Sequence, residues 1–236
     1  KQQLLGSQND MATIRLRAAL TGGGLVPRPG EISLAHGGVL FLDELPEFRK
    51  SVLEVLRQPL ESRMIQISRA HGKYSFPAGF MLVAAMNPCP CGRFPAPECV
   101  CTPAQIQGYL GKISQPFLDR IDLCAEASRV KYEDLSAKKR GEDSAEIRRR
   151  VCRARKIQQD RYKKTEIRVN AELGSRELKK FCELGSDEQK LMSQAFSILN
   201  LTARAYHRII RTARTIADLD GAEQIRTEHL NEAIGY

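Results

Sequence analysis

The sequence predicts an α/β part over residues 1–135, followed by an all-helical part over residues 136–236. In the first part, short apolar, β-prone runs alternate with a helical pattern, which is typical of a sheet flanked by helices. One of these runs, Val39–Leu42, is apolar without a break, as in the buried strands of parallel sheets, and it ends in two carboxylates. From Ser144 onward almost no strand pattern remains, and segments with helical spacing follow one another.

Five strands and one helix are expected in the first part, after a loop rich in glycine and proline at Thr21–Gly30. The strands are predicted at residues 31–35, 39–42, 64–68, 73–76 and 80–86. The third and fourth of them should form a hairpin, because only a short polar tip, Arg69–Gly72, separates them. The helix should occupy residues 48–62 and break at Pro59, and a further short strand should begin at Arg120–Leu123.

Five helices are expected in the second part, and Ser and Asp residues suited to N-caps precede several of them. They are predicted at Ser144–Arg161, Ser175–Leu184, Asp187–Leu199, Thr202–Leu219 and Thr227–Ile234. In the fourth helix, one face carries the apolar residues Tyr206, Ile209, Ile210, Ala213, Ile216 and Ala217. The opposite arc carries four arginines, which are Arg204, Arg208, Arg211 and Arg214. Such a row of arginines is ordinarily a solvated face.

The amino-acid composition limits the classes of protein to which this chain can belong. A hydrophobic content of 42% supports a core, and the net charge of +9, with a dense basic stretch at Ile147–Lys156, suits an anionic partner, although solubility alone also accounts for it. No apolar run approaches the ~18 residues of a membrane helix, and seven cysteines fit reduced thiols or metal ligands better than a disulfide framework. We therefore expect a cytoplasmic protein with no membrane partner. Because the chain starts at Lys1 rather than Met, we expect an excised fragment.

Polar residues follow two of the predicted strands. Asp43 and Glu44 end one strand and Asn87 ends another, and the carboxyl ends of parallel strands are where such sheets bind ligands. An Asp that holds Mg²⁺, a Glu that polarises water and a neutral Asn near the γ-phosphate fit hydrolysis of a nucleoside triphosphate. The alternative is a pair of carboxylates that are simply solvated at the end of a strand.

Four longer stretches amount to a family resemblance. "PRPGEISLAHGGVLFLDELPEF", "AAMNPCPCG", "LDRID" and "ARAYHRIIRTARTIADL" resemble the AAA+ ATPases of the magnesium-chelatase-like family, and the likeness extends from Gly22 to Gly221. The resemblance implies a parallel-sheet core of the P-loop type, a helical lid, and assembly into a ring that is hexameric in related motors. It also implies ATP and Mg²⁺ as cofactors.

The resemblance assigns roles to individual residues. Asp43 and Glu44 match the Walker B pair, with Asp43 on the Mg²⁺ of ATP, and Asn87 matches the first sensor. Arg120 matches the arginine finger, which acts on the nucleotide of a neighbouring subunit. Arg204 matches the second-sensor arginine of the lid, and the fallback residues for that role are Arg208 and Arg211.

One departure from the family pattern concerns the phosphate-binding loop. The printed sequence contains no G-x-x-x-x-G-K-[ST], and "TGGGLV" has neither the lysine nor the hydroxyl that follows it. That loop supplies the backbone N–H groups and the lysine that bind the phosphates. The expectation is a fragment that lacks the P-loop and the N-terminal domain and binds ATP poorly or not at all.

A cluster of cysteines follows Asn87. Cys89, Cys91, Cys99 and Cys101 form two C-x-C pairs on either side of a short loop rich in proline and glycine. Four thiolates so close in sequence can hold a structural zinc ion tetrahedrally, whereas free thiols packed in a loop are the alternative. The C-x-C spacing is tighter than the usual C-x-x-C.

Three functions compete. The resemblance favours the competence branch of the family, and hence an ATP-driven ring motor on DNA that acts in transformation or recombination, with Arg69, His71 and Lys73 of the hairpin on the phosphate backbone. The alternatives are the ATPase subunit of a magnesium chelatase and a non-catalytic interaction module. For the hairpin itself, the alternative is an ordinary edge ribbon with solvated charges.

Overall fold

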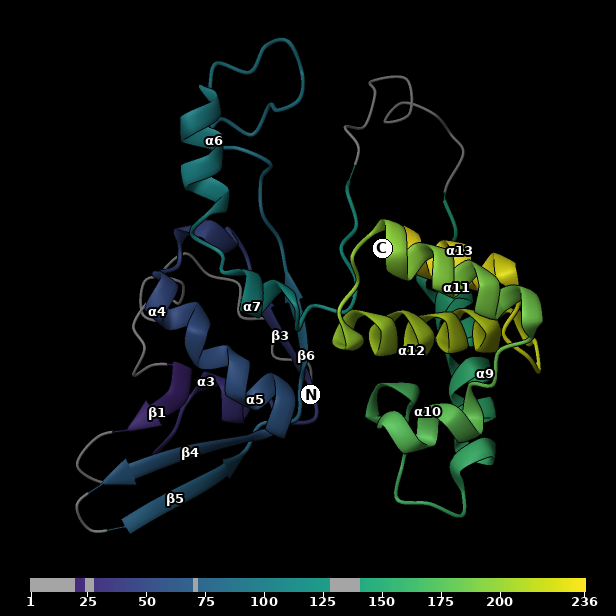
Figure 1. Ribbon diagram of the computed structural model, residues 1–236. Helices are drawn as coiled ribbons and strands as arrows, with labels where there is room; N and C mark the ends of the chain where they lie inside the picture. Colours follow the sequence, from purple (N-terminus) through teal and green to yellow (C-terminus); the bar gives the residue numbers. More distant parts are fainter. Residues whose placement is uncertain (1–19, 24–27, 70–71, 128–140) are drawn as a thin grey trace. The chain divides into compact units, whose positions relative to one another are not determined.

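The structure is a computed structural model that describes residues 20–23, 28–69, 72–127 and 141–236. The chain divides into two compact units, Lys1–Ile121 and Asp122–Tyr236 (Figure 1). The first unit is mixed α/β with a parallel strand pair and the second is helical, so the predicted fold class is confirmed. The predicted domain boundary at residue 135 lies outside the described residues and stays a prediction.

Three two-stranded sheets and several short helices build the described part of the first unit. The strands are β1 (Gly22–Gly23), β2 (Arg28–Pro29), β3 (Val39–Leu42), β4 (Met64–Arg69), β5 (Gly72–Pro77) and β6 (Met81–Ala84). The helical segments are α3 (Glu31–Leu34), η1 (Leu45–Glu47), α4 (Lys50–Leu53), η2 (Glu54–Leu56), α5 (Arg57–Ser62), α6 (Pro103–Leu110) and α7 (Gln115–Leu118). The β1–β2 and β4–β5 pairs are antiparallel, and β3 pairs with β6 in parallel.

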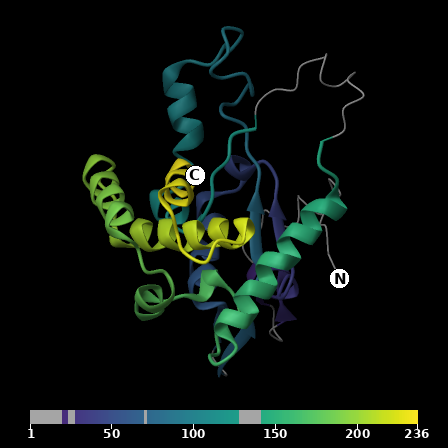
Figure 2. The ribbon, with the colours of Figure 1, turned by 90° about the vertical axis from the view of Figure 1, so that its right-hand side faces the viewer.

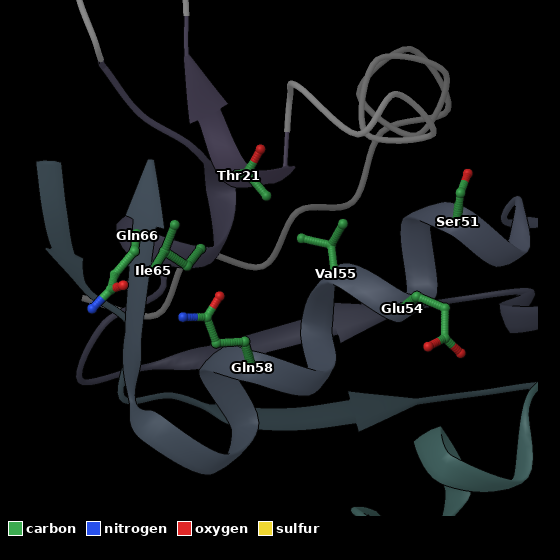
Figure 3. A pocket seen from close by; sticks show the side chains of 7 residues that line it. All are labelled: Thr21, Ser51, Glu54, Val55, Gln58, Ile65 and Gln66. Atoms are coloured by element: carbon green, nitrogen blue, oxygen red, sulfur yellow. The ribbon is translucent and has the colours of Figure 1, made fainter. Parts of the chain in front are cut away.

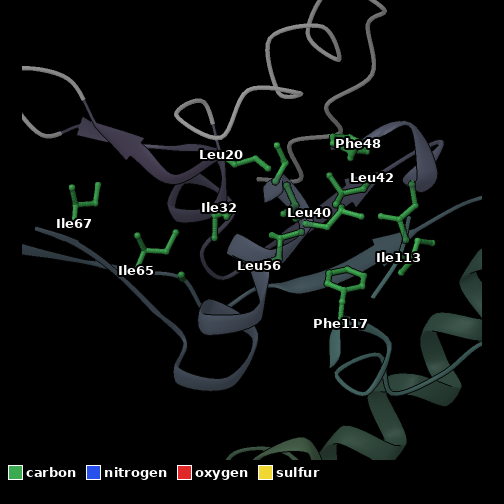
Figure 4. Packing of buried hydrophobic residues seen from close by; sticks show 14 residues of the cluster. Leu20, Ile32, Leu40, Leu42, Phe48, Leu56, Ile65, Ile67, Ile113 and Phe117 are labelled. Carbon is green, nitrogen blue, oxygen red and sulfur yellow. The ribbon is translucent and has the colours of Figure 1, made fainter. Parts of the chain in front are cut away.

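The core of this unit forms around β3. Leu40 and Leu42 are each 1% exposed, and they belong to one buried cluster with side chains from the helices that follow, such as Leu56 and Phe117 (Figure 4). Val39 and Phe41, on the other face of the strand, are only half-buried. The unbroken apolar run predicted burial on both faces. Among the described residues only the face with Leu40 and Leu42 is fully buried.

Several elements differ from the sequence-based expectations. The strand predicted at residues 31–35 is instead the one-turn helix α3 at Glu31–Leu34, and Arg120–Leu123 forms no strand. Pro59 does not end the helical run, which continues through α5 to Ser62. Two helices, α6 and α7, were not predicted at all.

The two described ends of the glycine- and proline-rich loop, residues 20–23 and 28–30, lie close against each other. A Cβ on Gly22 would lie 2.0 Å from the carbonyl oxygen of Arg28, and a Cβ on Gly30 would lie 2.2 Å from the nitrogen of Gly22. No side chain fits such distances, so these two positions need glycine for close contact between backbones.

The second unit contains five α-helices among its described residues. They are α9 (Ser144–Tyr162), α10 (Ser175–Phe181), α11 (Ser186–Ile198), α12 (Ala203–Asp220) and α13 (Thr227–Gly235), and the 3₁₀ turn η3 (Asn170–Glu172) follows α9. Helix α12 packs against α9, which is the long green helix of Figure 2. Side chains of α12 supply the centre of the core, where Ile209, Ile210 and Ala213 are buried with Leu230 of α13.

Helix ends in this unit follow the expected cap chemistry in part. The side chain of Asp143 accepts the N–H of Glu146 at 2.7 Å, and that of Thr202 accepts the N–H of Ala205 at 3.2 Å, as expected for N-caps. The N-cap of α11 is Gly185, which has no side-chain cap, so the Ser and Asp that follow lie inside the helix. None of the helices that the structure describes is long and apolar enough to cross a membrane.

Candidate functional site

Asp43, Glu44 and Asn87 lie at the same edge of the parallel β3–β6 pair. The register sets Leu42 opposite Ala84, and the pairing continues past both strands. The N–H of Ala85 donates to the oxygen of Leu42 at 2.9 Å, and the N–H of Leu45 donates to the oxygen of Ala85 at 3.0 Å. The two strand ends are therefore tied together where their polar residues begin.

The backbone at Glu44 is held in an unusual conformation. Its φ of 51° and ψ of 48° are left-handed, which costs a residue other than glycine about 1–2 kcal/mol. The side chain of Asp43 supports this turn by accepting the N–H of Glu44 at 2.8 Å, and buried Leu45 and Pro46 anchor η1 directly after it. Both acidic side chains are exposed at the edge. A strained turn that presents two carboxylates to solvent is typical of a functional site.

Asn87 is exposed and lies beside the loop that follows it. A Cβ on Gly92 would meet the amide group of Asn87 at 3.6–3.9 Å, so the Asn87 side chain lies against the backbone of Gly92. Tyr109 of α6, which is only 8% exposed, lies near the backbone of Asn87. Burial raises the pKa of Tyr109, the carboxylates of Glu47 and Glu44 raise it further, and the backbone of Asn87 acts in the opposite sense.

Tyr109 was not among the predicted site residues, although one signal in the sequence marks the start of its helix. Thr102 and Gln105 form a capping box in which the Thr102 hydroxyl accepts the N–H of Gln105 and the Gln105 side chain accepts the N–H of Thr102. The T-x-x-Q spacing with proline at the first helical position marks the start of a helix. It places Tyr109 two turns further on.

The oxygen atoms at this edge suit a divalent cation and a phosphate. Carboxylate oxygens are ligands that Mg²⁺ prefers, and it usually combines one or two of them with substrate phosphates and water. Asp43 fits that part. Glu44 can polarise a water molecule, and a neutral amide on Asn87 can orient it without adding negative charge.

Arg120 lies in the turn after α7, and its side chain is 11% exposed. It pairs with Glu61 of α5 at 2.7 Å and also donates to the carbonyl oxygen of Pro116, while its buried Nε has no hydrogen-bond partner. The finger role of Arg120 stays a prediction.

The arginines of α12 have separate environments. Arg204 is exposed and Arg208 is half-buried, and their predicted role at the nucleotide stays a prediction. Arg211 donates to the carbonyl oxygen of Leu173 at 3.2 Å. Arg214 was placed on the solvated arc, which is wrong: it is 2% exposed and pairs with Asp218 one turn further along the helix.

The four cysteines after Asn87 come together in space. The Sγ–Sγ distances are 3.4 Å from Cys89 to Cys91, 3.7 Å from Cys89 to Cys99 and 3.6 Å from Cys91 to Cys99, and all four sulfurs, Cys101 included, lie within 4.8 Å of one another. A tetrahedral zinc site with Zn–S bonds of about 2.3 Å has edges of about 3.8 Å between sulfurs. A disulfide would need about 2.05 Å. The cysteine set therefore fits a zinc ion in size and shape.

Backbone N–H groups surround these sulfurs. The N–H of Phe94 donates to Cys89 at 3.4 Å, and hydrogen bonds from the backbone of Arg93 and then of Val100 lower the pKa of Cys91 to about 6. These backbone groups act on the thiols although Pro90, between Cys89 and Cys91, has no N–H to donate. The backbone of Cys91 acts to lower the pKa of Cys101, but burial and the neighbouring thiols raise it overall to about 12. Four thiolates repel one another, and a cation would remove that conflict.

The hairpin extends from the core at the opposite end of this unit from α6 (Figure 1). Ile65 and Ile67 of β4 anchor it in the core cluster, and Lys73 of β5 is exposed beside Tyr74. Arg69 ends β4 opposite Gly72, while His71 lies outside the described residues. The predicted hairpin is confirmed as an element, and its contact with DNA stays a prediction.

A pocket also opens beside the helical run of this unit. Its lining residues are Thr21, Ser51, Glu54, Val55, Gln58, Ile65 and Gln66 (Figure 3). It includes none of the residues of the β3–β6 edge. Glu54, its one acid, is already bonded to the Ser114 hydroxyl and to Arg57, which together lower its pKa. We assign the chemistry to the strand edge rather than to this pocket.

An α/β unit with an acid pair and an amide at one strand edge, followed by a helical unit, fits the AAA+ class of proteins. The chain belongs to the magnesium chelatase family within that class. The family model for magnesium chelatase, subunit ChlI, matches residues 11–135, and the model for the C-terminal part of the same subunit matches residues 141–236. The match begins at residue 11, earlier than the likeness seen from Gly22 onward.

Individual relatives agree with the family. The chain is 50% identical to "Competence protein ComM" of Haemophilus influenzae and 46% identical to "Uncharacterized protein YifB" of Escherichia coli, in each case over 92% of this chain and 42% of the relative. It is 24% identical to the chloroplastic magnesium-chelatase subunit ChlI of Glycine max, over 98% of this chain and 50% of that protein. The chain thus spans half or less of the length of these relatives.

Proposed function

We propose that the full-length gene product is an ATPase that assembles into a ring, hexameric by likeness to the family, and drives movement along DNA. One observation carries the ATPase part: the parallel β3–β6 pair places Asp43, Glu44 and Asn87 at one edge, with the turn at Glu44 held in a left-handed conformation. In the proposal, Asp43 holds the Mg²⁺ of ATP, Glu44 activates the attacking water and Asn87 orients it.

The DNA part rests on charge and on similarity. The chain carries a net charge of +9, and the exposed hairpin brings Lys73, next to exposed Tyr74, away from the core. The 50% identity to a protein named for competence, against 24% to a chelatase subunit, supports a role in transformation or recombination. An ATPase subunit of a magnesium chelatase is the second candidate, favoured by the family descriptions. A non-catalytic module is disfavoured by the strained acid-bearing turn.

We also propose that Cys89, Cys91, Cys99 and Cys101 hold one structural Zn²⁺. The observation behind this proposal is the set of Sγ–Sγ distances of 3.4–3.7 Å, close to the edge of a tetrahedral site.

The ATPase proposal predicts that Glu44→Gln in the full-length gene product lowers ATP turnover by about 10²-fold or more, because it removes the general base. ATP affinity should stay within about threefold, since the amide is isosteric. Steady-state turnover and calorimetric ATP titration measure the two quantities. Glu47→Gln is the matched control, an exposed carboxylate in η1 of the same turn, and should keep wild-type turnover. Equal loss of binding and turnover in Glu44→Gln would instead make Glu44 a structural residue.

The DNA proposal predicts that Arg69→Ala with Lys73→Ala weakens DNA binding and lowers the slope of log affinity against log salt by about two, because two fewer counterions are released. Basal ATP turnover without DNA should change little. Lys163→Ala with Lys164→Ala removes the same charge from two exposed residues after α9 and should leave the slope unchanged. Fluorescence anisotropy at several salt concentrations measures it. An unchanged slope in the hairpin variant would remove the hairpin from the DNA interface.

A further inference from the structure

The cysteine cluster adjoins the candidate nucleotide edge in the chain. Only Pro88 separates Asn87 from Cys89, which is 0% exposed. We propose that the zinc ion held by the four cysteines fixes the position of Asn87 and so makes ATP hydrolysis depend on the metal. The proposal rests on the roles given above to Asn87 and to the cysteines. In it, Cys89 and its partners are positioning residues rather than catalytic ones.

Two routes lead from the cluster to Asn87. Along the chain, Cys89 fixes the residue two places after Asn87, and the carbonyl oxygen of Cys89 accepts the N–H of Gly92 at 3.0 Å. Gly92 has a φ of +71° and lies against the side-chain amide of Asn87. The turn that the first two cysteines close is thus the surface on which the Asn87 side chain rests.

The second route runs through α6. Cys101 directly precedes Thr102, the N-cap of that helix. Two turns later Tyr109, which is 8% exposed, brings its phenol near the backbone of Asn87. The chain thus leads from Asn87 through the cysteines to α6, and α6 brings Tyr109 back to Asn87. The sulfur cluster holds the two ends of the intervening loop together.

Other interactions within the loop contribute little to holding its two ends together. Phe94 is 46% exposed and Val100 is 81% exposed, so neither contributes much apolar burial. The backbone hydrogen bonds within the loop are local turns, such as the N–H of Ala96 to the oxygen of Arg93 at 2.8 Å. Thiol contacts between sulfurs are weak. Four metal–sulfur bonds are strong enough to hold both ends of the loop together.

Removal of the metal should therefore loosen Asn87 while ATP is still bound through other groups. Misplacement of a catalytic group by about 1 Å can cost about 10²-fold in rate. The test compares the full-length gene product, purified without chelator, with Cys99→Ser/Cys101→Ser. The control is Cys124→Ser/Cys152→Ser, which changes two exposed cysteines outside the cluster.

The wild type and the control should each carry about one zinc per chain and equal turnover. The cluster variant should carry none, and amide hydrogen exchange in peptides covering residues 85–95 and 103–110 should be at least about tenfold faster, whereas peptides of the second unit exchange as before. Its ATP turnover should fall about 10²-fold, with ATP affinity within about threefold. Because this variant can fail to fold, the same quantities are measured in wild type stripped of zinc by a mercurial and then reduced with or without Zn²⁺. Turnover and slow exchange should return only with Zn²⁺.

Two results overturn the inference. If the wild type contains no zinc, or contains iron instead, the proposed zinc site does not exist, whatever the result for Glu44→Gln. A zinc-free protein with unchanged exchange near Asn87 and unchanged turnover leaves the metal without a positioning role. Failure of the ATPase proposal is separate from both, because it shows as normal turnover in Glu44→Gln while zinc content and exchange stay as expected.

Discussion

Arg120→Ala in the full-length gene product is expected to bind ATP with normal affinity and to lose ATP turnover by about 10³-fold or more. A guanidinium that reaches the γ-phosphate stabilises the charge that develops in the transition state, and such a contact is typically worth at least this much. If the contact is made to a neighbouring subunit, it requires a head-to-tail interface, which closes into a ring. Steady-state turnover with calorimetric ATP titration measures the effect.

The ion pair of Arg120 with Glu61 offers another explanation for a loss of turnover. Within its own chain, Arg120 pairs with Glu61 at 2.7 Å and is 11% exposed. Loss of the side chain could therefore loosen α7 against α5 and lower turnover indirectly. Glu61→Gln separates the two explanations, because it removes the ion pair and keeps the arginine. For a finger, Glu61→Gln retains turnover; for a purely structural pair, it matches Arg120→Ala.

Mixed oligomers also distinguish an arginine finger from a structural ion pair. Glu44→Gln subunits keep Arg120, and Arg120→Ala subunits keep an intact Glu44. When the two are mixed, the nucleotide site of an Arg120→Ala subunit can receive Arg120 from a neighbouring Glu44→Gln subunit, so partial turnover should return. Native mass spectrometry shows whether mixed rings have formed. No recovery in rings shown to be mixed would return Arg120 to its own subunit as a structural residue.

Long amphipathic helices and strand ends were accessible from the sequence. The predicted helices at Ser144–Arg161 and Thr202–Leu219 differ from α9 and α12 by one residue at each changed end, because many turns repeat the same spacing. The acid pair after β3 and Asn87 after β6 were placed at one edge by the rule that parallel strands share their carboxyl ends.

Short elements and distant partners were not accessible. The one-turn helix α3 is too brief to show helical periodicity, so its alternating apolar residues suggested a strand. The pairing of Arg120 with Glu61 joins residues 59 positions apart, which no local pattern reveals. Arg214 is different: it lies four residues after buried Ile210 and three before buried Ala217, so spacing alone places it in the buried stripe. Its charge suggested solvent, and its acidic partner at i+4 was overlooked.

That partner, Asp218, joins a buried polar network in the second unit. Asp218 is 1% exposed and receives hydrogen bonds from Arg161, Arg214 and Asn170, the last at 2.8 Å. Arg214 also donates to the carbonyl oxygens of Ala222 and Glu223, at 2.7 and 2.8 Å. Burial alone lowers the pKa of both arginines; the bonds to Asp218 raise that of Arg161 overall, whereas in Arg214 burial prevails. One carboxylate thus balances two guanidinium groups between α9 and α12.

Asp218→Ala is expected to destabilise the second unit by about 3–5 kcal/mol, because it leaves buried positive charge without its partner. Asp218→Asn should cost less, since its amide oxygen still accepts hydrogen bonds. Asp160→Ala, in α9 directly before Arg161, is the matched control: its ion pair with Lys156 has side chains 61% and 69% exposed, and such surface pairs contribute about 0–1 kcal/mol.

Hydrogen exchange in increasing urea measures the loss, read on peptides of α9 and α12 so that the second unit is observed separately from the first. Peptides of β3 and α5 should exchange as in the wild type. A small effect of Asp218→Ala, similar to that of Asp160→Ala, would mean that water reaches both arginines once the carboxylate is gone. The network would then contribute little to the stability of the second unit, and the contact between α9 and α12 would depend on the apolar core around Ile209, Ile210 and Ala213.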